Sequence, residues 1–142
     1  MLVAEFEFPE KLYYLKGNLW IKEKKGNYVL GLTSLGSSLA KEIVHIDLPE
    51  DGEKYVAGDT IASFETIKSV TSITLPFDCV IKKINEKLLD NPTLINIDCY
   101  GGGWILELSA KETRDLMETK EAAAYYKKII DKEKERYKGI YD

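Results

Sequence analysis

The alternation of apolar and polar residues predicts a body built of short β-strands. Apolar segments rich in β-branched residues recur between Gly, Pro and Asp or Asn residues from about Leu19 to Leu108. A strand is expected after the turn Gly26-Asn27, and another is expected to stop at Pro76, because proline removes a backbone donor. The predicted strands are residues 28–33, 43–48, 60–67, 69–75, 79–84 and 104–108.

In the predicted strand at residues 43–48, the period of two assigns side chains to opposite faces. Val44, Ile46 and Leu48 share one face, and His45 lies on the other. We therefore expect His45, the only histidine, to face solvent. The Ser-, Gly- and Ala-rich stretch before this strand fits a short helix or a loop equally well.

From Ser109 onward the pattern is typical of helices. Ser109 and Glu112 have the spacing of a capping box, which predicts a helix through about Glu118. Thr119 is placed to cap a second helix with one apolar face and a Lys- and Glu-rich opposite face. The apolar residues at helical spacing are Ala122, Tyr126, Ile129, Ile130 and Tyr137.

Length, composition and charge fit one globular domain. The chain has 142 residues, of which 44% are hydrophobic and 31% charged, and a net charge of −4. We expect one domain over residues 1–142, with a β body at about 19–108 and a helical C-terminal segment at about 109–138. The weak negative charge argues against nucleic acid as a partner. The N-terminus contains Glu5 and Glu7 and no long apolar run, so no membrane association is expected and the expected location is cytoplasmic.

Residues suited to catalysis are scarce. A single histidine leaves little basis for a catalytic triad, and Cys79 and Cys99 are too few and too far apart for a zinc site. We interpret both cysteines as small buried apolar residues. The run Gly101-Gly102-Gly103 leads into a strand-like segment, so it predicts a sharp turn or a close backbone approach rather than a nucleotide site. We expect no catalytic residues, no metal site and no enzymatic activity.

Lys68 has the most unusual setting in the chain. It lies between the strand-like runs at residues 60–67 and 69–75, which predicts the tip of a β-hairpin. An exposed lysine amine is protonated at neutral pH and needs an outside enzyme to be modified. From the residues alone, a solvated lysine in a turn is the simplest interpretation.

A motif around Lys68 resembles the lipoyl-lysine motif of the glycine cleavage H protein family. That family has a Glu-Ser-Val-Lys-Ala type sequence, which stands here as Glu65-Thr66-Ile67-Lys68-Ser69. The agreement runs from roughly Leu12 to the C-terminal helix. Further matching segments are Leu48-Pro49-Glu50-Asp51-Gly52, Val56-Ala57-Gly58-Asp59, Asn85-Glu86, Asp90-Asn91-Pro92-Thr93-Leu94-Ile95-Asn96 and Tyr100-Gly101-Gly102-Gly103-Trp104.

The resemblance implies a mostly β fold, a barrel-sandwich hybrid like that of lipoyl domains, with C-terminal helices. It implies lipoate attached covalently to Lys68, with Glu65 aiding recognition by the lipoylating enzyme, a lipoate ligase or lipoyltransferase. Lipoamide is a group carrier, for which the protein supplies position. The implied carrier takes an aminomethyl group from glycine decarboxylase to aminomethyltransferase and is reoxidised by dihydrolipoamide dehydrogenase.

Several departures from the family pattern leave other functions open. A second possibility is an H-like lipoate-binding protein of another pathway, such as heterodisulfide-reductase-like sulfur oxidation, and a third is an interaction module without lipoate. Biotin carriers fit less well, because methionines normally flank their lysine. The departures are Asn18-Leu19-Trp20 for His-Glu-Trp, Ala40-Lys41-Glu42 for Leu-Gly-Asp, Cys79 for a glycine after the hairpin, and Cys99 for a proline before Tyr100.

Overall fold

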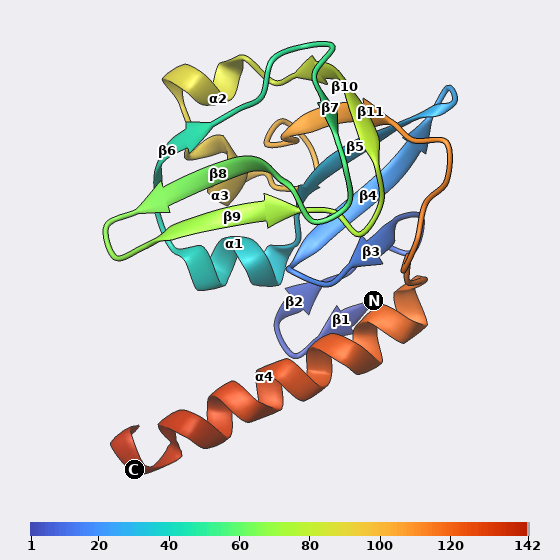
Figure 1. The fold of residues 1–142 in the computed structure, drawn as a ribbon. Helices are drawn as coiled ribbons and strands as arrows, with labels where there is room; N and C mark the ends of the chain where they lie inside the picture. The colour runs from blue at the N-terminus through green and yellow to red at the C-terminus, as the bar shows by residue number, and fades with distance from the viewer. Residues whose placement is uncertain (142) are drawn as a thin grey trace.

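Two antiparallel sheets and a long C-terminal helix make up most of the fold (Figure 1). The structure, a computed structural model, describes the backbone of residues 1–141 and the side chains of residues 1–135. The strands are β1 (Leu2–Val3), β2 (Phe6–Glu7), β3 (Tyr13–Leu15), β4 (Leu19–Lys24), β5 (Asn27–Leu32), β6 (Ile43–Asp47), β7 (Lys54–Tyr55), β8 (Thr60–Thr66), β9 (Val70–Thr74), β10 (Cys79–Ile84) and β11 (Leu106–Ser109). The helices are α1 (Ser34–Ala40), α2 (Lys87–Asp90), α3 (Leu94–Ile97) and α4 (Thr119–Tyr141).

The two larger sheets enclose the main apolar core. One has the strand order β3-β4-β5-β11-β10-β7 and the other has the order β6-β8-β9. Leu30 and Leu106 of the first sheet and Ile46, Phe64 and Ile73 of the second are buried in one cluster. The mostly β fold expected from the sequence is therefore confirmed, with the core between the sheets as in a sandwich.

The strand expected first, at residues 28–33, is β5, but β3 and β4 precede it in the same sheet. The predicted strands at residues 60–67, 69–75 and 79–84 correspond to β8, β9 and β10, and Pro76 follows the end of β9 as expected. The strand predicted at residues 104–108 is β11, which begins at Leu106.

The pattern of faces predicted for residues 43–48 is wrong at Val44. Val44 is 49% exposed, whereas Ile43 and Ile46 are buried. The register between β6 and β8 shifts between Ile43 and His45, which indicates a β-bulge. A bulge interrupts the period of two, so Val44 does not face the core. His45 is exposed, as predicted.

Three short helices lie within the predicted β body, and two of them, α2 and α3, were not predicted from the sequence. The stretch left open between helix and loop is α1, which is capped by the Thr33 hydroxyl accepting the Gly36 N–H at 3.0 Å. Helices α2 and α3 occupy the polar stretch around Asn91. Each has four residues, too few for a helical period to be visible in the sequence.

The helix predicted from Ser109 to Glu118 is absent from the described chain. Ser109 is the last residue of β11 and pairs with Val80 of β10. Met117 pairs with Tyr14 through two backbone hydrogen bonds of 2.8 and 2.9 Å. These pairings hold both ends of residues 110–118 in extended form, so the helical segment begins at 119 rather than 109.

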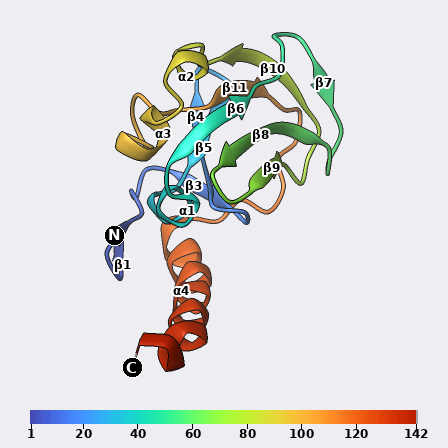
Figure 2. The same cartoon turned by 90° about the vertical axis from the view of Figure 1, so that its left-hand side faces the viewer.

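The second predicted helix is confirmed as α4. Ala122, Tyr126 and Ile130 are buried on one side and Ile129 is half-buried, as the helical spacing predicted. The side chain of Tyr137, also predicted for this face, lies outside the described residues. Figures 1 and 2 both show α4 below the sheets, running away from the rest of the molecule. Within residues 119–135, whose side chains are described, the packed face of α4 thus includes Ala122, Tyr126 and Ile130.

Candidate functional site

Lys68 lies exposed in the loop that joins β8 to β9. These strands pair in antiparallel fashion up to Glu65 opposite Val70, so residues 66–69 form the end of a hairpin. In Figure 1 this hairpin projects sideways, with its loop at the end away from the six-stranded sheet. The position predicted for Lys68 is confirmed, and its amine is accessible to a large partner.

The hydroxyl of Thr66 organises this loop. Its Oγ1 accepts the N–H groups of both Lys68 and Ser69, each at 3.3 Å. The Thr66 N–H donates to the Ser69 carbonyl at 2.9 Å. Thr66 was not among the predicted site residues, although Ser and Thr hydroxyls often accept amides two or three residues later in turns.

Glu65 lies on β8 three residues before Lys68, and its side chain is exposed. Its neighbours across the sheet are His45 on β6 and Val70 on β9. The His45 Nε2 lies 3.0 Å from an Asp47 carboxylate oxygen. The carboxylate of Glu65 is thus presented on the outer face of the three-stranded sheet, beside the hairpin tip.

Asn18 and Leu19 stand where the family often has His and Glu, and neither has an ionisable side chain. Leu19 is buried in the main core opposite Leu32. Asn18 is half-buried at a φ of 64°, and its backbone N–H donates to the Tyr126 hydroxyl at 3.0 Å. The side-chain oxygen of Asn18 is buried without a hydrogen-bond partner. These two positions therefore carry a neutral amide and an apolar side chain.

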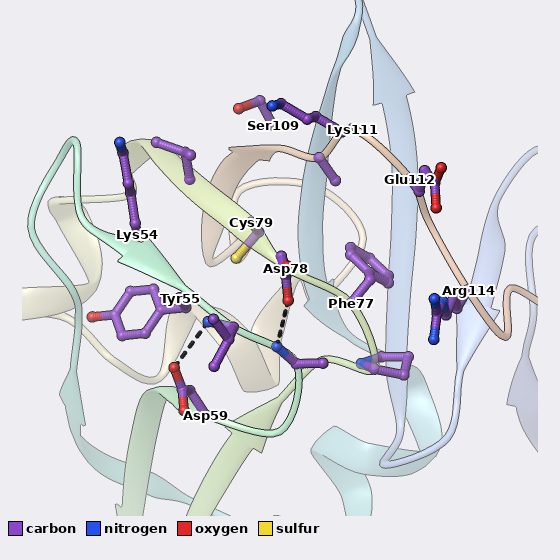
Figure 3. A pocket seen from close by; sticks show the side chains of 15 residues that line it. Lys54, Tyr55, Asp59, Phe77, Asp78, Cys79, Ser109, Lys111, Glu112 and Arg114 are labelled. Carbon is purple, nitrogen blue, oxygen red and sulfur yellow. Dashed lines mark hydrogen bonds between the residues drawn. The ribbon is translucent and has the colours of Figure 1, made fainter.

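A hollow of about 670 Å³ lies at the other end of the β8–β9 hairpin, beside its base (Figure 3). Two of its carboxylates are engaged by the backbone. Asp59 accepts the Val56 N–H and Asp78 accepts the Ala57 N–H, each at 2.9 Å. These carboxylates thus help to hold the loop before β8.

The remaining titratable groups of the hollow do not form a catalytic set. Burial raises the pKa of the Cys79 thiol to about 11, so the thiol is protonated at neutral pH. Burial and the Glu53 carboxylate raise the pKa of Tyr55 to about 12. The side chains lining the hollow include no histidine. The Cys79 thiol and the Tyr55 hydroxyl are therefore both protonated near neutral pH.

Other expectations concern metals, disulfides and membranes. The described residues contain no group of three or more His, Cys, Asp or Glu side chains arranged to hold a metal ion. Cys79 and Cys99 are both free thiols; Cys79 is buried, and Cys99 is half-buried. Within residues 1–141, none of the helices has the length and apolar character needed to cross a membrane.

Comparison with known proteins gives consistent matches. The family model described as "Glycine cleavage H-protein" matches residues 12–132. The chain is 38% identical over 126 residues to glycine cleavage system H protein 4 of Aquifex aeolicus, covering 87% of this chain and 74% of that protein. It is 35% identical over 123 residues to the glycine cleavage system H protein of Listeria monocytogenes, covering 87% of this chain and 98% of that protein.

A solved structure agrees with the sequence comparisons. The crystal structure of a glycine cleavage system H protein from Mycobacterium marinum superposes with a TM-score of 0.78 at 26% sequence identity, covering 84% of this chain and 98% of that one. The barrel-sandwich hybrid implied by the sequence is thereby confirmed. Because the family model spans most of the chain, from before β3 into α4, the chain belongs to the glycine cleavage H protein family.

Proposed function

We propose that this protein is a lipoyl carrier of the glycine cleavage system, with lipoate attached as an amide to Lys68. The observation that carries the proposal is the exposed position of Lys68 at a hairpin tip, within the family's lipoyl motif. The amine lies at the end of two paired strands, where neither sheet blocks the approach of an enzyme. Lipoate would supply a dithiolane that carries a group and cycles between oxidised and reduced forms.

A carrier role fits the shape of the molecule. A group tethered at a projecting tip has a high effective concentration at each enzyme that docks near the hairpin. The paired strands β8 and β9 fix the position of the backbone from which the tether would extend. In the glycine cleavage cycle, the arm would receive an aminomethyl group at glycine decarboxylase, deliver it at aminomethyltransferase and be reoxidised by dihydrolipoamide dehydrogenase.

The first test replaces Lys68 with arginine and measures lipoylation. The full chain is co-expressed with a lipoate ligase, and its intact mass is determined. Wild type should gain one lipoyl group, and Lys68→Arg should gain none, since the guanidinium is not expected to form the amide. The thermal midpoint should stay almost unchanged, because a substitution at an exposed loop usually alters stability by less than about 0.5 kcal/mol.

Lys25 provides a matched control. It is also exposed at a hairpin tip, between β4 and β5, but lies outside the lipoyl motif. Lys25→Arg should be lipoylated like wild type. Lipoylation of Lys68→Arg would place the attachment site on another lysine. A wild-type chain that stays unmodified with a competent ligase would favour an interaction module without lipoate.

We also propose that Glu65 helps the lipoylating enzyme to recognise the hairpin. Its exposed carboxylate lies beside the tip, where its charge could steer a ligase or lipoyltransferase toward Lys68. Glu65→Gln should lower the rate of lipoylation at low salt, and the difference should shrink at high salt because exposed charges are screened. Equal rates for wild type and Glu65→Gln in both conditions would contradict this role.

A second function, lipoate-dependent transfer in another pathway such as heterodisulfide-reductase-like sulfur oxidation, is favoured by one observation. Leu19 is buried where the family often has a glutamate, so this chain lacks the polar contribution of that carboxylate to partner docking or to holding the arm. The lipoylated protein can be incubated with glycine and glycine decarboxylase. An intact-mass gain of one aminomethyl group supports glycine cleavage. If the mass does not increase, although dihydrolipoamide dehydrogenase still reduces the lipoyl arm, the result supports the other pathway.

A further inference from the structure

The hairpin that bears Lys68 turns without the backbone conformations usual for a tight hairpin. Such turns favour residues with positive φ, most often Gly or Asn. Among the described residues with positive φ, none lies between Thr66 and Val70. Ile67 is β-branched and disfavours positive φ, which suits a four-residue loop over residues 66–69, since such loops are often built around a type I turn.

Thr66 holds this loop through both its backbone and its hydroxyl. Its N–H donates to the Ser69 carbonyl at 2.9 Å. Its Oγ1 accepts the amide hydrogens of Lys68 and Ser69, both at 3.3 Å. These bonds are long, so each is individually weak. Together they connect the end of β8 to the backbone of the lysine itself and of the residue after it.

Few other contacts hold the tip. Ile67 is 85% exposed and Val70 is 65% exposed, so apolar packing does little to order the loop. Thr66 itself is half-buried and pairs with Ile43, a fully buried residue of β6. The hydroxyl therefore lies where the ordered sheet meets the exposed loop.

We propose that Thr66 is a positioning residue, whose hydroxyl holds the Lys68 backbone in the conformation that the lipoylating enzyme binds. This inference rests on the proposed attachment of lipoate to Lys68. In that reaction the Lys68 amine attacks the carbonyl carbon of lipoyl-adenylate, an amide forms, AMP leaves and the protons lost by the amine pass to solvent. Thr66 touches none of the reacting atoms and acts only on where the amine is presented.

The energetic argument concerns the ordering of the loop. An enzyme that binds a loosely ordered segment must order it, and the lost entropy weakens binding. A loop already held by Thr66 avoids part of this loss. The effect should therefore appear in KM for the carrier protein, whereas kcat should change little.

The test compares Thr66→Val and Thr66→Ser in the full-length apo protein. Valine keeps the shape of threonine without the hydroxyl, and serine keeps the hydroxyl. Lipoate and ATP are supplied in excess and lipoate ligase in a catalytic amount, and intact mass gives the initial rate of modification at several carrier concentrations. We expect Thr66→Val to raise KM about three- to tenfold, in keeping with the loss of a modest net hydrogen-bond contribution. Thr66→Ser should restore most of the wild-type KM.

Thr71→Val is the matched control. Thr71 is exposed on β9 of the same hairpin, and its replacement removes a hydroxyl outside the Thr66 to Ser69 loop. This variant should be modified like wild type. Amide hydrogen exchange adds a reading that does not depend on the enzyme: the Lys68 and Ser69 amides should exchange faster in Thr66→Val, with the thermal midpoint nearly unchanged.

Any of three KM results would contradict the role of Thr66. The first is a wild-type KM in Thr66→Val, and the second is a KM in Thr66→Ser as high as in Thr66→Val. The third is a rise in KM in Thr71→Val equal to that in Thr66→Val. Unchanged exchange of both amides would also contradict it. A wild-type chain that is never lipoylated would instead contradict the proposed function, and with it this role, so the two failures are distinguishable.

Discussion

At the scale of single residues, Lys41 shows how a departure from the family pattern is accommodated. It stands where the family often has glycine, and it ends α1 with a φ of 59° and a ψ of −147°. Residues with a Cβ atom rarely adopt this conformation, because the Cβ clashes with the backbone. The surrounding contacts keep it in place, since the Lys41 N–H donates to Ser38 and the Lys41 carbonyl accepts from Asn96.

Lys41→Gly should therefore stabilise the protein. Relief of the backbone strain should exceed the extra conformational entropy that glycine gives the unfolded chain, for a net gain of about 1 kcal/mol. Urea unfolding monitored by circular dichroism measures the difference. Lys41→Ala, which removes the charge but keeps the Cβ, should show no comparable gain; an equal gain would attribute the effect to charge.

At the scale of elements, α4 is attached to the sheet through Tyr126. The Tyr126 hydroxyl donates to the Leu15 carbonyl and accepts the Asn18 N–H at 3.0 Å. Its ring stacks on Phe8 with centroids 5.4 Å apart. Burial raises the pKa of Tyr126 to about 12, which keeps the hydroxyl protonated and able to donate.

Tyr126→Phe should destabilise the protein by about 1–3 kcal/mol, because the ring still packs but two backbone groups lose their partner. The neighbouring variant Tyr125→Phe is the control, and its cost should stay below about 0.5 kcal/mol because this tyrosine is only half-buried. Both values can be obtained from urea unfolding. Similar costs for the two variants would mean that the Tyr126 hydrogen bonds contribute nothing beyond ring packing.

At the scale of the whole molecule, the buried residues form two clusters. One cluster lies between the sheets and includes Ile81. The other is rich in aromatic rings, contains residues of α4 and of the N-terminal strands, and includes Ile130. Ile81 is fully buried, and Ile130 is 6% exposed near the outer end of the packed part of α4. The second cluster therefore has more freedom to adjust after a truncation.

The same substitution at these two positions should have unequal effects. Ile81→Ala should cost about 3–5 kcal/mol, because the enclosed core cannot collapse around the missing methyl groups. Ile130→Ala should cost about 1–2 kcal/mol, since the helix can shift and water can reach the site. Denaturant unfolding of both variants provides the comparison, and equal losses would mean that the aromatic cluster is as rigid as the core between the sheets.

The lysine-bearing hairpin could be predicted from the sequence because its cues are local. The two strand-like runs on either side of Lys68 and the stop at Pro76 are all encoded within about 17 consecutive residues. The spacing of apolar residues that packs α4 is local in the same way. Lys68 could therefore be placed at an exposed tip before any tertiary contact was known.

Other features depended on contacts between distant parts of the chain. Residues 110–118 do not form the predicted helix, because β10 pairs with Ser109 and Tyr14 pairs with Met117, and neither partner is visible in a capping-box motif. Val44 faces solvent because β6 bulges against β8.

The sequence by itself determined the strand-rich body, the hairpin tip at Lys68 and the apolar face of α4, because hydrophobic period and proline act over a few residues. The tertiary structure alone decided where the last helix begins and which side chains leave the core at the bulge. Those outcomes depend on which backbone donors and acceptors find partners far along the chain, and a local pattern carries no information about such partners.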